Sequence, residues 1–132
     1  MNYDIEQRKE MARQLRKQGR NCCQCVAMVF DDLTGIDGET VGRIAEGFGS
    51  GFGGRQEVCG TVSGATMVCG MTYADMDRKG IYGKVKDFMG AFERLEGSCV
   101  CRDLKQPGRK PCLELITDAV EMLHKQLEAD GR

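Results

Sequence analysis

The stretch GFGSGFGGRQEVCGTVSGA, residues 47–65, decides between the fold classes open to this chain. From Gly49 it contains G-x-G-x-x-G, the letters of a dinucleotide-binding loop, which must follow a strand and open a helix. No strand pattern precedes these glycines, because residues 38–48 have helical spacing. The stretch therefore predicts a turn between two helices. Gly49 would end the first helix at positive φ, and the turn would deliver Cys59 to the start of the second.

Apolar residues recur at helical spacing along most of the chain, whereas few segments alternate polar and apolar residues. Ile81, Val85, Phe88 and Phe92, for example, follow one another at steps of three and four. The spacing predicts helices over residues 3–18, 22–34, 38–48, 59–73, 80–96 and 112–128, with a short helical turn after Cys101. We therefore expect one all-α domain over residues 1–132, folded as a compact bundle of five to six helices.

Two glycines lie one turn apart in the helix expected over residues 59–73. Gly60 and Gly64 lower the helix propensity of this segment, but they leave room on one face for a neighbouring backbone. We expect another stretch of backbone to approach closely there.

The bulk composition excludes several functional classes. The formal net charge is −1, far from the strongly basic balance that nucleic-acid binding requires. No apolar run approaches the roughly 18 residues of a membrane helix, and the charged N-terminus has no signal-peptide core. We expect a cytoplasmic protein that binds no nucleic acid and inserts into no membrane. Residues 3–18 are weakly amphipathic and suit packing on a second subunit, so a homodimer stays open.

Four of the eight cysteines fall where the pattern predicts helix N-termini. They are Cys22 after the N-cap residue Asn21, Cys59 after the glycine turn, Cys101 at the start of CRDL, and Cys112 after Pro111. Free N–H groups and the helix dipole stabilise negative charge at such positions, which lowers the pKa of a thiol. The thiolate is the form that attacks disulfides and binds metals. These four residues are therefore the candidate site.

The other four cysteines give weaker indications of a chemical role. Free cysteine is often a small buried hydrophobe, which is the reading we favour for Cys69, whereas Cys23 and Cys99 stay unassigned. Residues 22–25 also spell C-x-x-C, but the βαβ context of a thioredoxin-like motif is missing. A zinc site would need a second pair of ligands with C-x-x-C spacing. The only other close pair, C-x-C from Cys99, matches that spacing poorly.

The order of these motifs resembles the redox-active family named C_GCAxxG_C_C. The likeness runs from about Asn21 to the last helix, through NCCQCV, the glycine-rich run into Cys-Gly-x-x-x-Gly, CRDL and a downstream cysteine. It implies a small all-helical protein with redox or metal chemistry, and the family's four cysteines fall on Cys22, Cys59, Cys101 and Cys112. The chain departs from the motif at Thr61, where the family has Ala. It also departs at Cys23 and Cys25, where relatives have small residues.

Three functions follow from these residues. In the first, clustered thiols carry out thiol/disulfide electron transfer with an unidentified redox partner, as in a thiol-based oxidoreductase. Cys22 and Cys59 would attack, with Cys101 and Cys112 as resolving thiols or as a second pair. In the second, the same four thiolates bind an iron–sulfur cluster or zinc. In the third, the chain is a non-catalytic helical interaction module.

Two further polar positions are expected in contact with solvent. His124, the only histidine, is expected at the surface rather than as a general base. The pair Asp31-Asp32 is expected at a solvated helix end.

Overall fold

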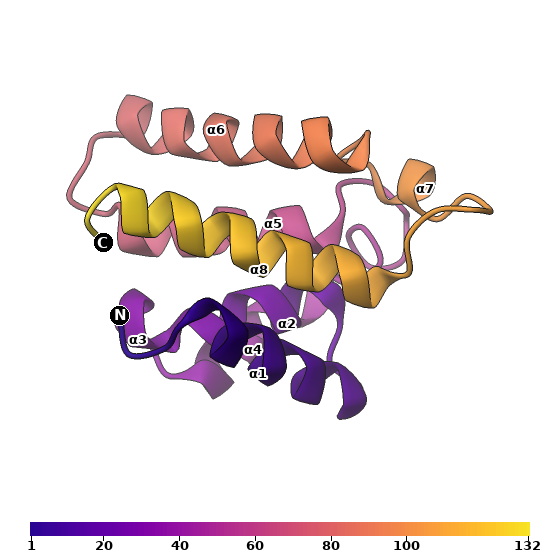
Figure 1. The fold of residues 1–132 in the computed structure, drawn as a ribbon, viewed down its shortest axis with the longest axis horizontal. Coiled ribbons are helices and arrows are strands. Elements are labelled where there is room, and N and C mark those ends of the chain that lie inside the picture. Colours follow the sequence, from indigo (N-terminus) through magenta and orange to yellow (C-terminus); the bar gives the residue numbers. More distant parts are fainter.

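The computed structural model describes all of residues 1–132, and its regular secondary structure is helical, with loops between the helices (Figure 1). The α-helices are α1 (Ile5–Lys17), α2 (Cys22–Ala27), α3 (Asp31–Thr34), α4 (Gly38–Ala45), α5 (Gly60–Thr72), α6 (Arg78–Glu96), α7 (Cys101–Leu104) and α8 (Cys112–Ala129). Two 3₁₀ turns follow directly on α-helices: η1 (Met28–Phe30) continues α2, and η2 (Glu46–Phe48) continues α4. The only β pairing is an isolated antiparallel bridge between Val58 and Val100. The all-α prediction is confirmed.

The predicted number of helices was slightly too low, because the segment 22–34 is not one helix. It divides into α2, η1 and α3. At the division, the Val29 carbonyl oxygen accepts a hydrogen bond from Arg8 Nη1 at 2.6 Å. The turn expected after Cys101 forms as α7, which has only four residues.

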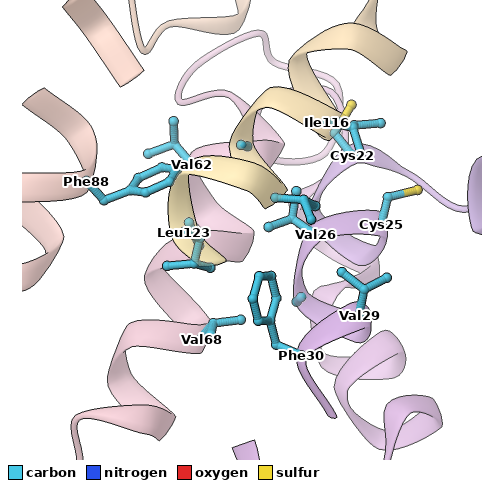
Figure 2. Close-up of a cluster of buried hydrophobic side chains, with 14 of the residues drawn as sticks. Cys22, Cys25, Val26, Val29, Phe30, Val62, Val68, Phe88, Ile116 and Leu123 are labelled. Atoms are coloured by element: carbon cyan, nitrogen blue, oxygen red, sulfur yellow. The ribbon is translucent and has the colours of Figure 1, made fainter. Parts of the chain in front are cut away.

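Helices α2 and α5 pack closely, and two glycines allow this. A Cβ atom on Gly64 would lie 2.7 Å from the Cys23 carbonyl oxygen, and one on Gly60 would lie 3.0 Å from Cys22 Cβ. The expected close approach at these glycines is confirmed. Around this contact the core gathers Val26, Phe30, Val62, Val68, Phe88, Ile116 and Leu123 from α2, η1, α5, α6 and α8 (Figure 2).

The glycine-rich loop turns in the left-handed sense. Residues 50–54 all have positive φ, including the non-glycine residues Ser50 at 51° and Phe52 at 65°. Left-handed backbone is disfavoured for residues with a Cβ atom, so a run of it favours glycine. Gly49 itself has φ −62°, so the prediction that it ends the helix at positive φ was wrong. It is glycine for another reason, since its Cβ would lie 2.7 Å from Asn21 Nδ2.

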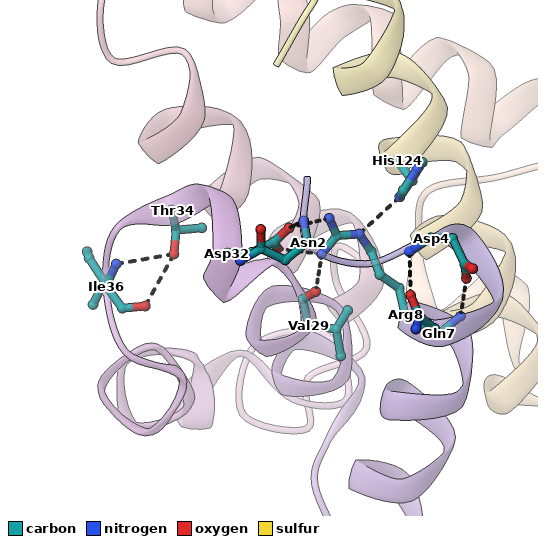
Figure 3. Close-up of polar contacts among 9 residues, drawn as sticks. All are labelled: Asn2, Asp4, Gln7, Arg8, Val29, Asp32, Thr34, Ile36 and His124. Carbon is teal, nitrogen blue, oxygen red and sulfur yellow. Dashed lines mark hydrogen bonds and ion pairs between the residues drawn. The ribbon is translucent and has the colours of Figure 1, made fainter.

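A buried polar cluster joins α1, α3 and α8 (Figure 3). Arg8 is fully buried and forms an ion pair with Asp32 through Nη1 at 2.6 Å and Nη2 at 2.8 Å. Its Nε donates to His124 Nδ1 at 3.0 Å. The prediction that His124 is a surface residue was therefore wrong, and so was the solvated end expected at Asp32. A long arginine reaching in from α1 gives both residues a partner in the interior.

Two other expectations concern the outside of the molecule. No helix has the length and apolar character needed to cross a bilayer. Helix α1 packs on α8 and α2 of its own chain, with Ala12 fully buried. The homodimer stays a prediction.

Candidate functional site

The four candidate cysteines lie at helix starts, as the sequence predicts. Cys22, Cys101 and Cys112 are the first residues of α2, α7 and α8, and Cys59 is the N-cap residue of α5. The starts of these four helices gather at the right-hand end of Figure 1, beside the glycine-rich loop and the end of α6. Free N–H groups therefore converge on this end of the molecule.

Cys22 and Cys112 form a pair, although they are distant in sequence. The neighbouring Cys22 thiol lowers the pKa of Cys112, and the charges of Lys105 and Arg16 act in the same direction. The same interaction, together with burial, raises the pKa of Cys22. Cys112 is the partly exposed member of the pair, whereas Cys22 is 9% exposed. The lowered pKa therefore belongs to the more accessible of the two sulfur atoms.

Local backbone structure fixes the Cys22 end of this pair. Asn21 and Gln24 form a capping box, in which Asn21 Oδ1 accepts from the Gln24 N–H at 2.9 Å and Gln24 Oε1 accepts from the Asn21 N–H. Asn21 Nδ2 also donates to the Glu46 carbonyl oxygen at 2.9 Å. The cap thus holds the start of α2 against the end of the helical stretch that precedes the glycine-rich loop.

Cys59 lies close enough to Cys22 and Cys101 for its charge to act on both thiols. Its negative charge, when ionised, contributes to raising the pKa values of Cys22 and Cys101. Its Sγ atom is 3.0 Å from Thr61 Oγ1, so the residue that departs from the family motif contacts the cluster directly. Cys59 is 5% exposed, and the hydroxyl of Thr61 is its polar neighbour.

Backbone pairing holds Cys59 beside Cys101. The Cys59 N–H donates to the Cys99 carbonyl oxygen at 2.8 Å, and the Cys101 N–H donates to the Glu57 carbonyl oxygen at 2.6 Å. A Cβ atom on Gly51 would lie 2.9 Å from Cys101 Cβ, so the left-handed loop packs on this thiol. Burial raises the pKa of Cys101, and Lys105 opposes that shift.

The other four cysteines are buried in the core: Cys23, Cys25, Cys69 and Cys99. Burial raises the pKa of Cys23 to about 12 and those of the other three to about 11. Cys23 Sγ contacts Met67 Sδ at 3.7 Å. Thiols of this kind stay protonated at neutral pH and are poor nucleophiles. The core assignment of Cys69 agrees with its complete burial.

All eight cysteines are free thiols, and none is joined in a disulfide. No three His, Cys, Asp or Glu side chains lie together in a way that could hold a metal ion. The arrangement of the four candidate thiols therefore does not fit a zinc ion or an iron–sulfur cluster, which need several thiolates directed at one centre.

The residues that tune the site were not found from the sequence. Arg16 lies in the last turn of α1, and Lys105 follows α7 at its C-cap. The position of Lys105, one turn after Cys101, was a signal available in the sequence. Nothing in the sequence placed Arg16 near Cys112, because that proximity depends on how α1 packs on α8.

One comparison with known proteins gives a match. No curated protein and no solved structure matches this chain. A family model described as "Putative redox-active protein (C_GCAxxG_C_C)" matches residues 20–126, a range that includes all four candidate cysteines. Because that match covers most of the sequence, the chain belongs to the C_GCAxxG_C_C family.

Proposed function

We propose that the protein is a thiol/disulfide oxidoreductase in which Cys112 attacks and Cys22 resolves. The observation that carries the proposal is the pairing of these two thiols, with the lowered pKa on the partly exposed sulfur. A thiolate that is both accessible and stabilised is the form that attacks a disulfide. This order differs from the roles expected from the sequence, in which Cys22 and Cys59 attack.

The reaction proceeds in two exchanges. The Cys112 thiolate attacks one sulfur of a substrate disulfide, a Cys112–substrate bond forms, and the other half leaves as a thiolate that takes up a proton. Cys22 then loses its proton to solvent and attacks Cys112 Sγ, which releases the second half of the substrate. Two protein thiols are oxidised to one disulfide, and one substrate disulfide is reduced to two thiols.

Cys59 and Cys101 would supply a second pair. Their segments are joined by backbone hydrogen bonds, and the charge of Cys59 acts on both Cys22 and Cys101. Cys59 could attack the Cys22–Cys112 disulfide at Cys22, and Cys101 would then resolve that mixed disulfide. The first pair would return to its reduced form, and the oxidising equivalent would rest on Cys59–Cys101. A redox partner, still unidentified, would reduce this second disulfide.

Trapping experiments with bis(2-hydroxyethyl) disulfide test the assignment. In Cys22→Ser the mixed disulfide on Cys112 should accumulate, because the resolving thiol is gone, and peptide mass mapping should find it there. In Cys112→Ser no such adduct should form at Cys22. The matched control is Cys69→Ala, which changes a buried thiol far along α5 and should behave as the unmodified protein does. Equal labelling of many cysteines, or an adduct on Cys22 alone, would overturn the proposal.

A further inference from the structure

An open apolar groove lies along one side of α5. Its volume is about 650 Å³, and its lining comes from α4, η2, the loop after η2, α5 and α6. Ten of its thirteen lining residues are hydrophobic, and none is charged. Val62 of α5 is 1% exposed and lies at the bottom of the groove, whereas Thr66 and Gly70 of the same helix are exposed. Solvent therefore reaches an apolar side of α5.

Helix α5 has no polar face to present to this solvent. None of its thirteen residues is charged. The two hydroxyl groups in the groove are bonded to the backbone of their own helix segment: Thr66 Oγ1 donates to the Val62 carbonyl oxygen at 2.8 Å, and Ser63 Oγ donates to that of Cys59 at 3.5 Å. A helix that is apolar on every side is expected to be covered on every side. Helices α2, α6 and α8 pack on α5, but the side in the groove has no cover from its own chain.

Two apolar side chains project at the rim of the groove. Ile44 of α4 is 56% exposed, and Phe52 of the left-handed loop is 45% exposed. The Phe52 ring is held in place by an edge-to-face contact with Phe48, with ring centroids 4.9 Å apart. The same face of the molecule thus carries both apolar projections and a hollow beside them. A two-fold interface requires this combination, because the same patch must fit itself.

The polar groups of the groove favour a second copy of the chain over a small molecule. A pocket for a small molecule offers a few free polar groups that orient the ligand. In this groove the hydroxyl groups of Ser63 and Thr66 are already bonded, and no charged group is present. An occupant that contributes only apolar side chains needs no such group, and the exposed Ile44 and Phe52 of another copy are of this kind.

The charges around the groove also permit self-association. The charged residues directly adjacent in sequence to lining positions are all exposed and include two of each sign: Asp37, Arg43, Glu57 and Lys86. Each charge at the rim therefore has a residue of opposite sign available on a second copy. The formal net charge of the chain is −1, so two copies repel each other little.

We propose that this groove is the interface of a symmetric dimer, in which Ile44 and Phe52 of each copy enter the groove of the other. A centre rich in Met and Phe with a polar rim is typical of such interfaces. The contact lies on the face of α4 and α5, not on α1, where the sequence suggested it. Thirteen lining residues are fewer than the roughly 20–30 per side of a standard interface, so we expect a Kd on the order of 10 µM.

Sedimentation equilibrium of the full chain tests this inference. A phosphine reductant keeps all thiols reduced, so that disulfides between chains cannot contribute. Between about 1 µM and about 500 µM the weight-average mass should rise from that of one chain to that of two. A mass that stays at one chain over this range overturns the inference. Continued growth beyond two chains also overturns it, because a two-fold interface closes at the dimer.

Two variants place a charge in the proposed interface. Gly70→Glu is tolerated by the fold, because a Cβ there meets nothing within 4 Å and glutamate has the higher helix propensity. Ile44→Glu places the charge on an exposed rim position. Each substitution should weaken association at least about tenfold, since a charge buried in an interface without a partner is costly.

Gly83→Glu is the matched control for these variants. Gly83 is also a helical glycine whose Cβ would meet nothing within 4 Å, but it lies on α6 outside the groove. This variant should dimerise as the unmodified protein does, and circular dichroism should show the same helix content in all three variants. Association that persists in Gly70→Glu and Ile44→Glu, or that is lost equally in Gly83→Glu, would place the contact elsewhere and overturn the inference.

A neutral fluorescent dye distinguishes a second copy from a small apolar ligand. The dye is N-phenyl-1-naphthylamine, whose emission rises in apolar surroundings. Because the dimer covers the groove, dye emission per chain should fall as the protein concentration increases, and Gly83→Glu should show the same fall. Emission per chain that does not change while dimers form would mean that the dimer leaves the groove open. A protein that binds the dye but stays monomeric has a groove for a small neutral molecule, and either result overturns the inference.

Discussion

Cys22 stabilises the thiolate of Cys112 across the interface of α2 and α8, and this contact makes the pair chemically unequal. The pKa of Cys112 is lowered to about 6, because the Cys22 thiol lies beside it and because Lys105 and Arg16 add positive charge. An isolated cysteine has a pKa near 8.5. Alkylation of Cys112 by iodoacetamide should therefore reach half its maximal rate near pH 6.

Substitutions at Cys22 separate the effect of its thiol on the pKa of Cys112 from the effect of the nearby positive charges. In Cys22→Ala the donor is lost, so the pKa of Cys112 should rise by a unit or more, a change worth about 1.4 kcal/mol per unit. In Cys22→Ser a hydroxyl donor remains, and the pKa should stay closer to that of the unmodified protein. The pH profile of Cys112 alkylation, followed by peptide mass, measures both. If Cys112 has the same alkylation profile in both variants, hydrogen-bond donation from residue 22 does not set the pKa of Cys112.

The contact between α2 and α5 depends on the absence of a side chain at Gly64. An added Cβ would lie 2.7 Å from the Cys23 carbonyl oxygen and 3.1 Å from Val26 Cβ. Gly64→Ala should lower the free energy of unfolding by about 1–3 kcal/mol, as overpacking of a core does. Urea unfolding followed by circular dichroism measures the change.

Gly70 on the same helix provides the control. A Cβ there would meet nothing within 4 Å, and the residue is exposed. Gly70→Ala should raise the stability by up to about 1 kcal/mol, because alanine has the higher helix propensity. Equal effects of the two substitutions would mean that the interface with α2 has no part in the result.

The helices of this fold could be predicted from the sequence because their apolar spacing is local information. Phe88 and Phe92 lie on the buried face of α6 as that spacing indicates. The division of the segment 22–34 could not be predicted, because it coincides with a hydrogen bond from Arg8, a residue of another helix. The partner of a buried polar group is a property of the tertiary structure, and periodicity carries no information about it.

Gly51 should matter more to the stability than Gly47, four residues earlier in the chain. A Cβ on Gly51 would lie 2.6 Å from the Glu57 nitrogen, and its φ of +70° is unfavourable for alanine. Gly51→Ala should lower the free energy of unfolding by about 2 kcal/mol or more, from strain and overpacking together. Because Gly51 packs on Cys101, the substitution should also speed alkylation of Cys101.

Gly47→Ala is the matched substitution in η2, just before the loop. A Cβ on Gly47 would meet nothing within 4 Å, and its φ lies outside the left-handed range. Stability and Cys101 alkylation should both stay close to those of the unmodified protein. A large effect at Gly47, or none at Gly51, would show that the left-handed turn does not hold Cys101.

The candidate site could be predicted in part. The four cysteines at helix starts follow from local signals such as Asn21 before Cys22 and Pro111 before Cys112. Which thiol pairs with which depends on how helices far apart in sequence pack, so the partnership of Cys22 with Cys112 was not predictable. The same is true of Lys105 and Arg16, whose charges reach Cys112 only through the fold.

The contact of Arg8 with His124 should make the stability depend on pH. Burial lowers the pKa of His124, and the positive charge of Arg8 adds to that effect, so the folded state favours the neutral imidazole. The unfolded chain, with a histidine pKa near 6.5, binds more protons below that pH. The stabilising contribution is therefore fully present above about pH 6.5 and is lost as the pH falls through 6.5 toward the lowered pKa. The slope is at most about 1.4 kcal/mol per pH unit.

Urea unfolding between pH 5 and 8 measures this dependence. The experiment is best done with Cys112→Ser, because the Cys112 thiol itself titrates near the same range. His124 is the only histidine, so His124→Gln in that background should flatten the slope between pH 5 and 6.5. The Asp32 carboxylate, whose pKa Arg8 holds down against the effect of burial, should add its own loss only at lower pH. An unchanged slope in His124→Gln would show that the imidazole is not the titrating group.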